Sequence, residues 1–413
     1  MELVADLRPF RALRPLPDRA AAVAAPPYDV VDVAEARALA AGNPDSFLHV
    51  SRPEIDLADG ADVAAVHAQG RRALAGLEQR GVLTRDPAPT LSVYRQRLEG
   101  TEQIGVVGGF AVADYLDGTI AVHEHTRPDK ENDRVAHADG LDAHDEPVFL
   151  MYPDDTDHAA AVDAVVTAVV AVVPDLRLTD SAGVEHALWV ISDQATLTAL
   201  TSAFAGLPRL FVADGHHRSA AAARLHGLHA DRAGAGETAI FPAVAFPASQ
   251  LTVLPYQRVV ADLNGLDPES LLAKLAGGFA VRALDAAPEP DRHQFGMYLA
   301  GCWYLLTAAA DSVDETDPIA RLDVALLQDT VLAPLLGIAD PRTDRRIGFV
   351  GGSRGSAELE RLVDSGRYAV AFALHPTSPA EVMAVADLGL VMPPKSTWFE
   401  PKLASGLFVH PLH

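Results

Sequence analysis

The chain has 413 residues and a formal charge of −23 at pH 7, because 33 lysines and arginines stand against 56 aspartates and glutamates. This length predicts two or three domains, and a hydrophobic fraction of 49% is enough to form a sizeable core. The acidic balance disfavours a nucleic-acid-binding protein and a protein that docks on anionic membranes, since both need a basic surface. A single cysteine, Cys302, excludes intrachain disulfides and metal sites built from several thiolates.

The N-terminal region, residues 1–100, is expected to be an α/β region of short elements. Its early prolines indicate short strands and ordered loops. Apolar spacing predicts helices over 33–41 and 61–80, with a strand at 47–50 between them. No basic segment followed by an apolar core opens the chain, so we expect a cytoplasmic protein.

Residues 101–265 are expected to form the central, β-rich core. A strand is predicted over 104–110, and Asp117-Gly118 is typical of a hairpin turn. A helix is predicted over 160–173, and its apolar stretch 164–173 is expected to be buried, because it is shorter than the roughly 20 residues that a bilayer requires. A short buried strand, 209–212, is expected to run directly into a polar motif.

Residues 266–413 return to alternating helices and strands. The pattern predicts helices over 268–275 and 324–336, and strands near 279–281 and 297–306. With borders placed at 100 and 265, the three regions together predict a mixed α/β (α+β) fold.

The segment Asp214–Arg218 gives the clearest indication of a functional site. A strand that turns through Gly215 into a helix leaves backbone N–H groups and the positive end of the helix dipole facing outward. His216, His217 and Arg218 add side-chain donors, and an arginine can bind a phosphate through two parallel bonds. Asp214 would repel a phosphate, so it is expected to cap the helix or to bind a Mg²⁺ ion that accompanies the phosphate. A plain capped helix with solvated histidines is the alternative.

A second charged segment, residues 123–134, follows a predicted strand. Glu124 could act as general base for a hydroxyl, and Arg127 or Lys130 could hold a phosphoryl oxygen. A solvated loop or a helix start would explain the same charges.

Two further polar segments, 43–54 and 392–402, combine charged, hydroxyl and aromatic side chains with prolines. A structural role for them is as plausible as a functional one. Five side chains from these segments are candidates for contacting the substrate or the phosphate: His49, Arg52, Lys395, Trp398 and Glu400.

Six motifs follow one another along the chain: Ala25-Pro-Pro-Tyr-Asp-Val30, Asn43-Pro-Asp-Ser-Phe-Leu-His-Val50, His123-Glu-His-Thr-Arg-Pro-Asp-Lys130, Ala213-Asp-Gly-His-His-Arg218, Arg346-Ile-Gly-Phe-Val-Gly-Gly352 and Met392-Pro-Pro-Lys-Ser-Thr-Trp-Phe-Glu-Pro-Lys402. Together they resemble the domain-of-unknown-function family 1015, over residues 8–410. The Asp-Gly-His-His-Arg motif also resembles the phosphate-binding element of the ParB/sulfiredoxin-like superfamily, which includes free-serine kinases.

This resemblance implies a ParB/sulfiredoxin-like core with additional N- and C-terminal α/β regions. It implies a kinase that transfers a phosphoryl group from ATP or ADP to the hydroxyl of free L-serine or a similar small hydroxy amino acid. Asp214, His216, His217 and Arg218 would face the nucleotide phosphates and Mg²⁺, with Asp214 as the metal ligand. The serine kinases use a glutamate as base; Glu124 is the expected one here, and Glu54 and Glu400 stay open.

The sequence departs from the family pattern at two places. Asp145-Glu146 stands where a glutamine or threonine and a small residue are expected, and Gln257 stands where asparagine is expected. These departures affect the expected substrate pocket more than the phosphate site.

Two other functions remain as hypotheses. The first is a nucleotide-binding, ParB-like switch without transfer chemistry, which would need a protein partner. The second is a metal-dependent hydrolase built on His123, His125, His216 and His217, although zinc is less expected than magnesium because no H-E-x-x-H motif or cysteine pair occurs. The expected partners are a nucleotide and a small substrate, without nucleic acid or membrane; self-association stays open.

Overall fold

The computed structural model describes residues 4–230 and 235–413 and divides the chain into two compact units. The first unit contains the chain up to Leu251 together with Pro401–His413, and the second contains Thr252–Glu400. The units differ from the three expected regions. The border expected at 100 falls between two strands that pair with each other, and the one expected at 265 falls inside the second unit.

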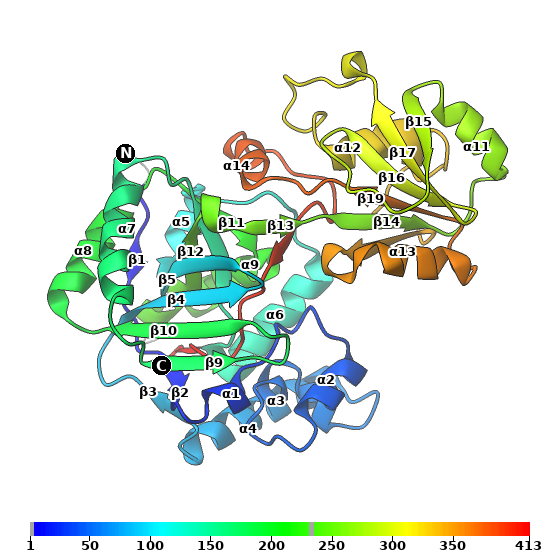
Figure 1. Cartoon of the computed structure of the whole chain (residues 1–413). Coiled ribbons are helices and arrows are strands. Elements are labelled where there is room, and N and C mark those ends of the chain that lie inside the picture. Colours follow the sequence, from blue (N-terminus) through cyan, green and yellow to red (C-terminus); the bar gives the residue numbers. More distant parts are fainter. Residues whose placement is uncertain (1–3, 231–234) are drawn as a thin grey trace. The chain divides into compact units, whose positions relative to one another are not determined.

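The first unit is built on a nine-stranded mixed sheet (Figure 1). Its strands, in spatial order, are β6 (Ile120–Ala121), β11 (Leu210–Asp214), β8 (Val148–Tyr152), β12 (Ile240–Pro247), β5 (Thr101–Ala111), β4 (Leu91–Leu98), β10 (Glu185–Ile191) and β9 (Leu176–Thr179), with β1 (Leu7–Arg8) paired to β5. The pairs β11–β6 and β12–β8 are parallel, and the others are antiparallel. This order places the end of β11 beside the start of β8.

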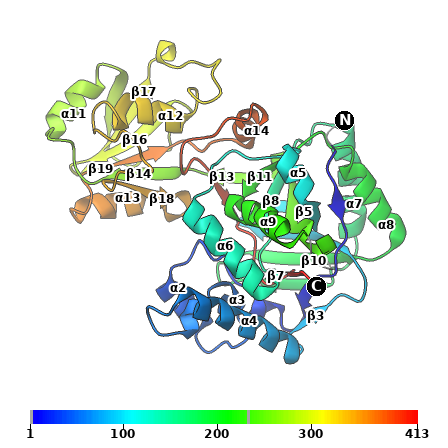
Figure 2. The same ribbon diagram turned by 180° about the vertical axis from the view of Figure 1, so that it is seen from behind.

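Helices flank this sheet, and α6 and α9 lie in front of it in the view from behind (Figure 2). The helices are α5 (Val112–Asp117), α6 (Pro128–Leu141), α7 (Asp157–Val170), α8 (Gln194–Phe204), α9 (His216–His229) and the short α10 (Ala235–Thr238). Val162 of α7 and Leu200 and Phe204 of α8 are fully buried in the same core as the strands. The helix expected over 160–173 is present as α7, but it buries only one face, and Val172 and Val173 beyond its end are exposed. None of the described helices has the length and apolar character needed to cross a membrane.

The N-terminal part of the first unit is helical and has its own core. Its elements are β2 (Leu13–Pro15), α1 (Ala20–Val23), α2 (Val33–Ala40), α3 (Leu48–Ser51), a 3₁₀ turn η1 (Pro53–Asp56), α4 (Val63–Gln79) and β3 (Leu83–Arg85), which pairs with β2. The core contains Phe47 and Leu74, and also Val409 from the far end of the chain. Close to it, β7 (Ala143–His144) pairs with β21 (His410–Pro411).

Two local expectations in this unit were wrong. The strand expected at 47–50 is the helix α3, because a short segment rich in apolar residues fits a buried helical turn as well as a strand. The hairpin expected at Asp117-Gly118 is the end of α5, where Gly118 adopts the left-handed conformation (φ 86°) that ends many helices.

The second unit is a six-stranded antiparallel sheet with helices. Its strands, in spatial order, are β15 (Phe279–Leu284), β17 (Cys302–Ala308), β16 (Gln294–Leu299), β19 (Val370–Leu374), β14 (Tyr256–Val260) and β18 (Ile347–Gly351). A separate pair joins β13 (Thr252–Leu254) to β20 (Trp398–Glu400). Its helical elements are α11 (Pro268–Leu275), α12 (Asp323–Leu327), a π-helix η4 (Gln328–Leu332), α13 (Gly355–Asp364) and α14 (Pro379–Asp387), with the short 3₁₀ turns η3 (Ala310–Ser312) and η5 (Gly352–Arg354). One more 3₁₀ turn, η2 (Ala248–Gln250), belongs to the first unit.

The sequence pattern was largely correct for this unit. The strand near 279–281 is β15, and the helix over 268–275 is α11. The single strand expected over 297–306 is the hairpin β16–β17, and the helix expected over 324–336 is α12 followed by the π-helix.

Candidate functional site

The strand-to-helix corner predicted at Asp214–Arg218 is present in the first unit. Strand β11 ends at Asp214, Gly215 adopts the left-handed conformation (φ 96°), and α9 begins at His216. A Cβ atom on residue 215 would lie 3.0 Å from Nε of Arg218, so both the backbone angle and the arginine position require glycine. Gly215 has no side chain, so α9 begins without a side-chain cap, and the positive end of its dipole lies at the corner.

Arg218 lies in the first turn of α9, and its side chain is only 10% exposed. Its guanidinium donates to the carbonyl oxygen of Pro147, and its Nη1 and Nη2 lie 3.9 Å from Glu146 and 3.6 Å from Asp214, respectively. Burial opposes the charge, but the carboxylates of Asp214 and Glu146 outweigh burial and raise the pKa of Arg218. Arg218 is therefore a permanent, positioned cation at the corner.

Asp214 is held between two cations. Its Oδ2 accepts a hydrogen bond from Nζ of Lys402 at 3.2 Å and faces Nη2 of Arg218. Burial opposes the ionisation of Asp214. The positive charges of Lys402 and Arg218 outweigh this effect and hold the pKa of Asp214 well below its usual range. The helix cap expected from Asp214 is absent, since Gly215 occupies the N-cap position.

The residues around Asp214 do not fit a protein-held magnesium site. The carboxylate is already neutralised by two cations, which a Mg²⁺ ion would have to displace or approach. Within residues 4–230 and 235–413, no three His, Cys, Asp or Glu side chains form a group that could hold a metal ion.

Glu146, which precedes β8, is a buried carboxylate beside Arg218. Its Oε1 accepts hydrogen bonds from the backbone N–H of Tyr28 at 2.9 Å and from Oγ of Ser405 at 2.8 Å. Its Oε2 is buried and makes no hydrogen bond with any described residue. Burial raises the pKa of Glu146 to about 7, which Arg218 lowers only in part. This carboxyl group therefore changes its charge near neutral pH.

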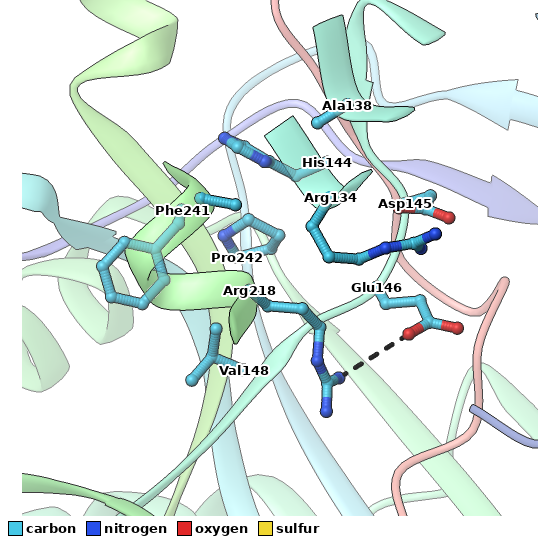
Figure 3. A pocket seen from close by; sticks show the side chains of 10 residues that line it. Arg134, Ala138, His144, Asp145, Glu146, Val148, Arg218, Phe241 and Pro242 are labelled. Carbon is cyan, nitrogen blue, oxygen red and sulfur yellow. Dashed lines mark ion pairs between the residues drawn. The ribbon is translucent and has the colours of Figure 1, made fainter. Parts of the chain in front are cut away.

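A small pocket connects Glu146 and Arg218, which point toward each other (Figure 3). His144, Arg134 and Asp145 also line it. The cavity measures about 20 Å³, which is space for about one water molecule.

Two histidines are buried next to the corner. The rings of His123 and His216 are perpendicular, with centroids 4.4 Å apart. Burial lowers the pKa of His123 to about 4 and also lowers that of His216. Both rings are therefore neutral at pH 7, and Nε2 of His216 makes no hydrogen bond with any described residue. His216 can act as a neutral donor but brings no positive charge.

The charged segment after β6 reaches the corner through its backbone. The N–H of Arg127 donates to Nε2 of His217 at 3.1 Å, while the Arg127 side chain is 70% exposed and pairs with Asp129. Lys130 is exposed in the first turn of α6, and Glu124 is partly buried next to His123. The structure thus brings the segment to the corner, but the Arg127 guanidinium is engaged elsewhere.

His49 and Arg52 have structural contacts. His49 is bonded to Asp56 at 2.9 Å. Arg52 donates to the carbonyl oxygens of Tyr28 at 2.6 Å and of Val31 at 2.8 Å. Arg52 therefore supports the loop whose Tyr28 N–H binds Glu146.

Lys395, Trp398 and Glu400 lie in the second unit. Trp398 donates from Nε1 to Oε2 of Glu400 at 2.6 Å, and Nζ of Lys395 lies 5.1 Å from the centroid of the Tyr256 ring. Their expected roles in binding substrate or phosphate stay predictions.

Three residues of the corner were not predicted as site residues: Tyr28, Glu146 and Lys402. In the sequence, Asp145-Glu146 stands out only as a departure from the family pattern. Lys402 is the second lysine of the segment 392–402, in which Lys395 is the residue expected to bind phosphate.

The family model described as "Protein of unknown function (DUF1015)" matches residues 7–325. None of the curated proteins compared with the sequence matches it. Solved structures that match the chain include free serine kinase in complex with AMP (13% identity, 71% of this chain and 86% of that chain, TM-score 0.33). A variant of free serine kinase in complex with ADP shares 15% identity, covers 71% of this chain and 87% of its own, and has a TM-score of 0.34. SbnI with a C-terminal truncation, from Staphylococcus aureus, shares 14% identity, covers 74% and 87%, and has a TM-score of 0.40. Similarity at this level assigns no role to a residue, and the ParB-like core stays a prediction.

Proposed function

Since the chain belongs to the DUF1015 family of proteins of unknown function, we propose its function from the chemistry of the Asp214–Arg218 corner. The proposed activity is the transfer of a phosphoryl group from ATP or ADP to the hydroxyl of free L-serine or a similar small hydroxy amino acid. One observation carries the proposal: a chain of net charge −23 places uncapped helix N–H groups and a buried arginine at the end of one strand. The acceptor is inferred from the motif resemblance.

Phosphoryl transfer depends mainly on positioning and on charge compensation. The N–H groups at the start of α9 and the guanidinium of Arg218 would bind phosphate oxygens, while His217 would link this site to the segment that contains Glu124. Glu124 is the proposed base for the acceptor hydroxyl. Glu146 is less suited to that role, because its Oε1 already accepts hydrogen bonds from Tyr28 and Ser405.

The test is direct. Purified protein is incubated with L-serine, MgCl₂ and either ATP or ADP, and O-phosphoserine is measured by mass spectrometry. We expect product with at least one nucleotide, and a loss of kcat/KM of about 100-fold or more in Arg218→Ala. Arg361→Ala, which removes an exposed arginine paired with Glu358 on α13, is the matched control and should retain the wild-type rate.

Two results would refute the kinase. One is the absence of product with both nucleotides and with every small hydroxy amino acid tried. The other is an unchanged rate in Arg218→Ala. Tight nucleotide binding without turnover would instead favour the nucleotide-binding switch.

A further inference from the structure

The C-terminal segment Pro401–His413 is built into the first unit, although the 149 residues Thr252–Glu400 that precede it form the second unit. Backbone hydrogen bonds join Ser405 to Ala25 and Val409 to Leu13, and β21 pairs with β7. Residues 403–412 are all buried. The segment is therefore a fixed part of the first unit's core.

Two buried glutamines hold the start of this segment. Gln96 of β4 donates from Nε2 to the carbonyl oxygen of Lys402 at 2.7 Å. Gln103 of β5 donates from Nε2 to Oε1 of Gln96 at 2.9 Å and to the carbonyl oxygen of Pro401 at 3.3 Å. Because both amides are at most 2% exposed, they fix the backbone from which the Lys402 side chain starts.

The side chain of Lys402 ends at the corner. Its Nζ lies 3.2 Å from Oδ2 of Asp214, the same oxygen that faces Arg218 at 3.6 Å. The side chain is 15% exposed, so the ammonium is largely withdrawn from solvent. An ammonium has three donors and can bind Asp214 and an anion at the same time.

Two basic side chains meet at the corner. Arg218 and Lys402 both lie beside the carboxylate of Asp214, next to the N-terminus of α9. Arg218 is also attracted by Glu146 and Asp29, and the buried Oε2 of Glu146 makes no hydrogen bond with any described residue. A phosphate at the start of α9 would offer acceptors to both basic side chains.

We propose that Lys402 is a second phosphate-binding residue of the corner, delivered by the C-terminal segment and oriented by Asp214. Asp214 then acts as a positioning residue for Lys402 and not as a metal ligand. The inference rests on the proposed nucleotide site, and it adds a contact that lies beyond residues 7–325, the part of the chain that the family model matches.

Isothermal titration calorimetry with ADP on the 413-residue chain tests this proposal. We expect Lys402→Met to weaken ADP binding about tenfold or more, the size of one hydrogen bond to a charged group, and Lys402→Arg to retain part of the affinity. Lys274→Met, on the exposed face of α11, removes a lysine without touching the corner and should bind like wild type. Because salt screens charge contacts, the affinity of Lys402→Met should also vary less with salt than that of wild type.

Thermal unfolding of each variant shows whether it is folded. If Lys402→Met does not fold, Lys402→Arg, which keeps the positive charge, is compared with wild type instead. Wild-type affinity and wild-type salt dependence in folded Lys402→Met would overturn the role of Lys402 while leaving the nucleotide site in place. If wild type does not bind ADP, the same titration with pyrophosphate decides: binding that weakens in Lys402→Met supports the anion contact without the kinase. Absence of binding to both ligands overturns both proposals.

Discussion

The backbone N–H of Tyr28 donates a hydrogen bond to Oε1 of Glu146 across 118 positions of sequence. Ser405, from the opposite end of the chain, donates to the same oxygen at 2.8 Å. One carboxyl group thus connects the N-terminal loop, the start of β8 and the C-terminal segment. Its second oxygen faces Arg218, so any change in the charge of Glu146 acts directly on the corner (Figure 3).

The charge of Glu146 should make the stability of the fold depend on pH. Burial raises its pKa from 4.5 to about 7, so between these values the folded chain binds more protons than the unfolded chain. The contribution of Glu146 to the free energy of unfolding therefore falls as pH rises through this window. As pH rises from 4.5 to 7, the free energy of unfolding of Glu146→Gln should therefore increase relative to that of wild type by about 1–3 kcal/mol.

Urea unfolding at a series of pH values measures this difference. Glu78→Gln, at an exposed site on α4, is the control and should follow wild type at every pH. The prediction fails if the difference in the free energy of unfolding between Glu146→Gln and wild type stays constant from pH 4.5 to pH 8. Glu146 would then be ionised in the folded chain throughout.

Gly215 should tolerate no side chain. Its φ of 96° is unfavourable for other residues, and a Cβ atom would lie 3.0–3.1 Å from the guanidinium of Arg218. We expect Gly215→Ala to lower the free energy of unfolding by about 1–3 kcal/mol and to weaken ADP binding by displacing Arg218. Calorimetry and urea unfolding measure the two effects.

Gly227, in the same helix, provides the matched control. It has open space around its Cβ position, so Gly227→Ala should stabilise α9 by about 0.5–1 kcal/mol without changing ADP binding. Equal stability and equal affinity in both variants would contradict the geometry of the corner.

The corner itself could be predicted from sequence because its determinants are local. An apolar strand, an aspartate, a glycine and three donor side chains occupy ten consecutive residues, and each acts through neighbours in the chain. The error at 47–50 is local as well, since a segment of four residues, three of them apolar, is too short to show a period that separates helix from strand.

The partners of the corner could not be predicted, because they come from distant segments. Lys402 and Asp214 are 188 positions apart, and Ser405 and Glu146 are 259 positions apart. The spacing of apolar residues does not show that residues 401–413 belong to the first unit, because the whole second unit lies before them in the sequence. For the same reason the sequence does not distinguish Lys402, which lies at the corner, from Lys395, which lies in the second unit.

The buried pair His123–His216 should give the opposite pH dependence to Glu146. Burial lowers the pKa of His123 from 6.5 to about 4, so the folded chain binds fewer protons than the unfolded chain in this window. Stability is therefore lost as pH falls from 6.5 to 4, and His123→Gln should remove this loss. As pH falls over that range, the free energy of unfolding of His123→Gln should rise relative to that of wild type by about 1–3 kcal/mol.

Urea unfolding measures this difference, and His125→Gln, at the exposed neighbour, is the control. The free-energy difference between His123→Gln and wild type could instead be independent of pH. That result would mean that His123 is accessible to protons in the folded chain, and that the corner is open to solvent from the β6 side.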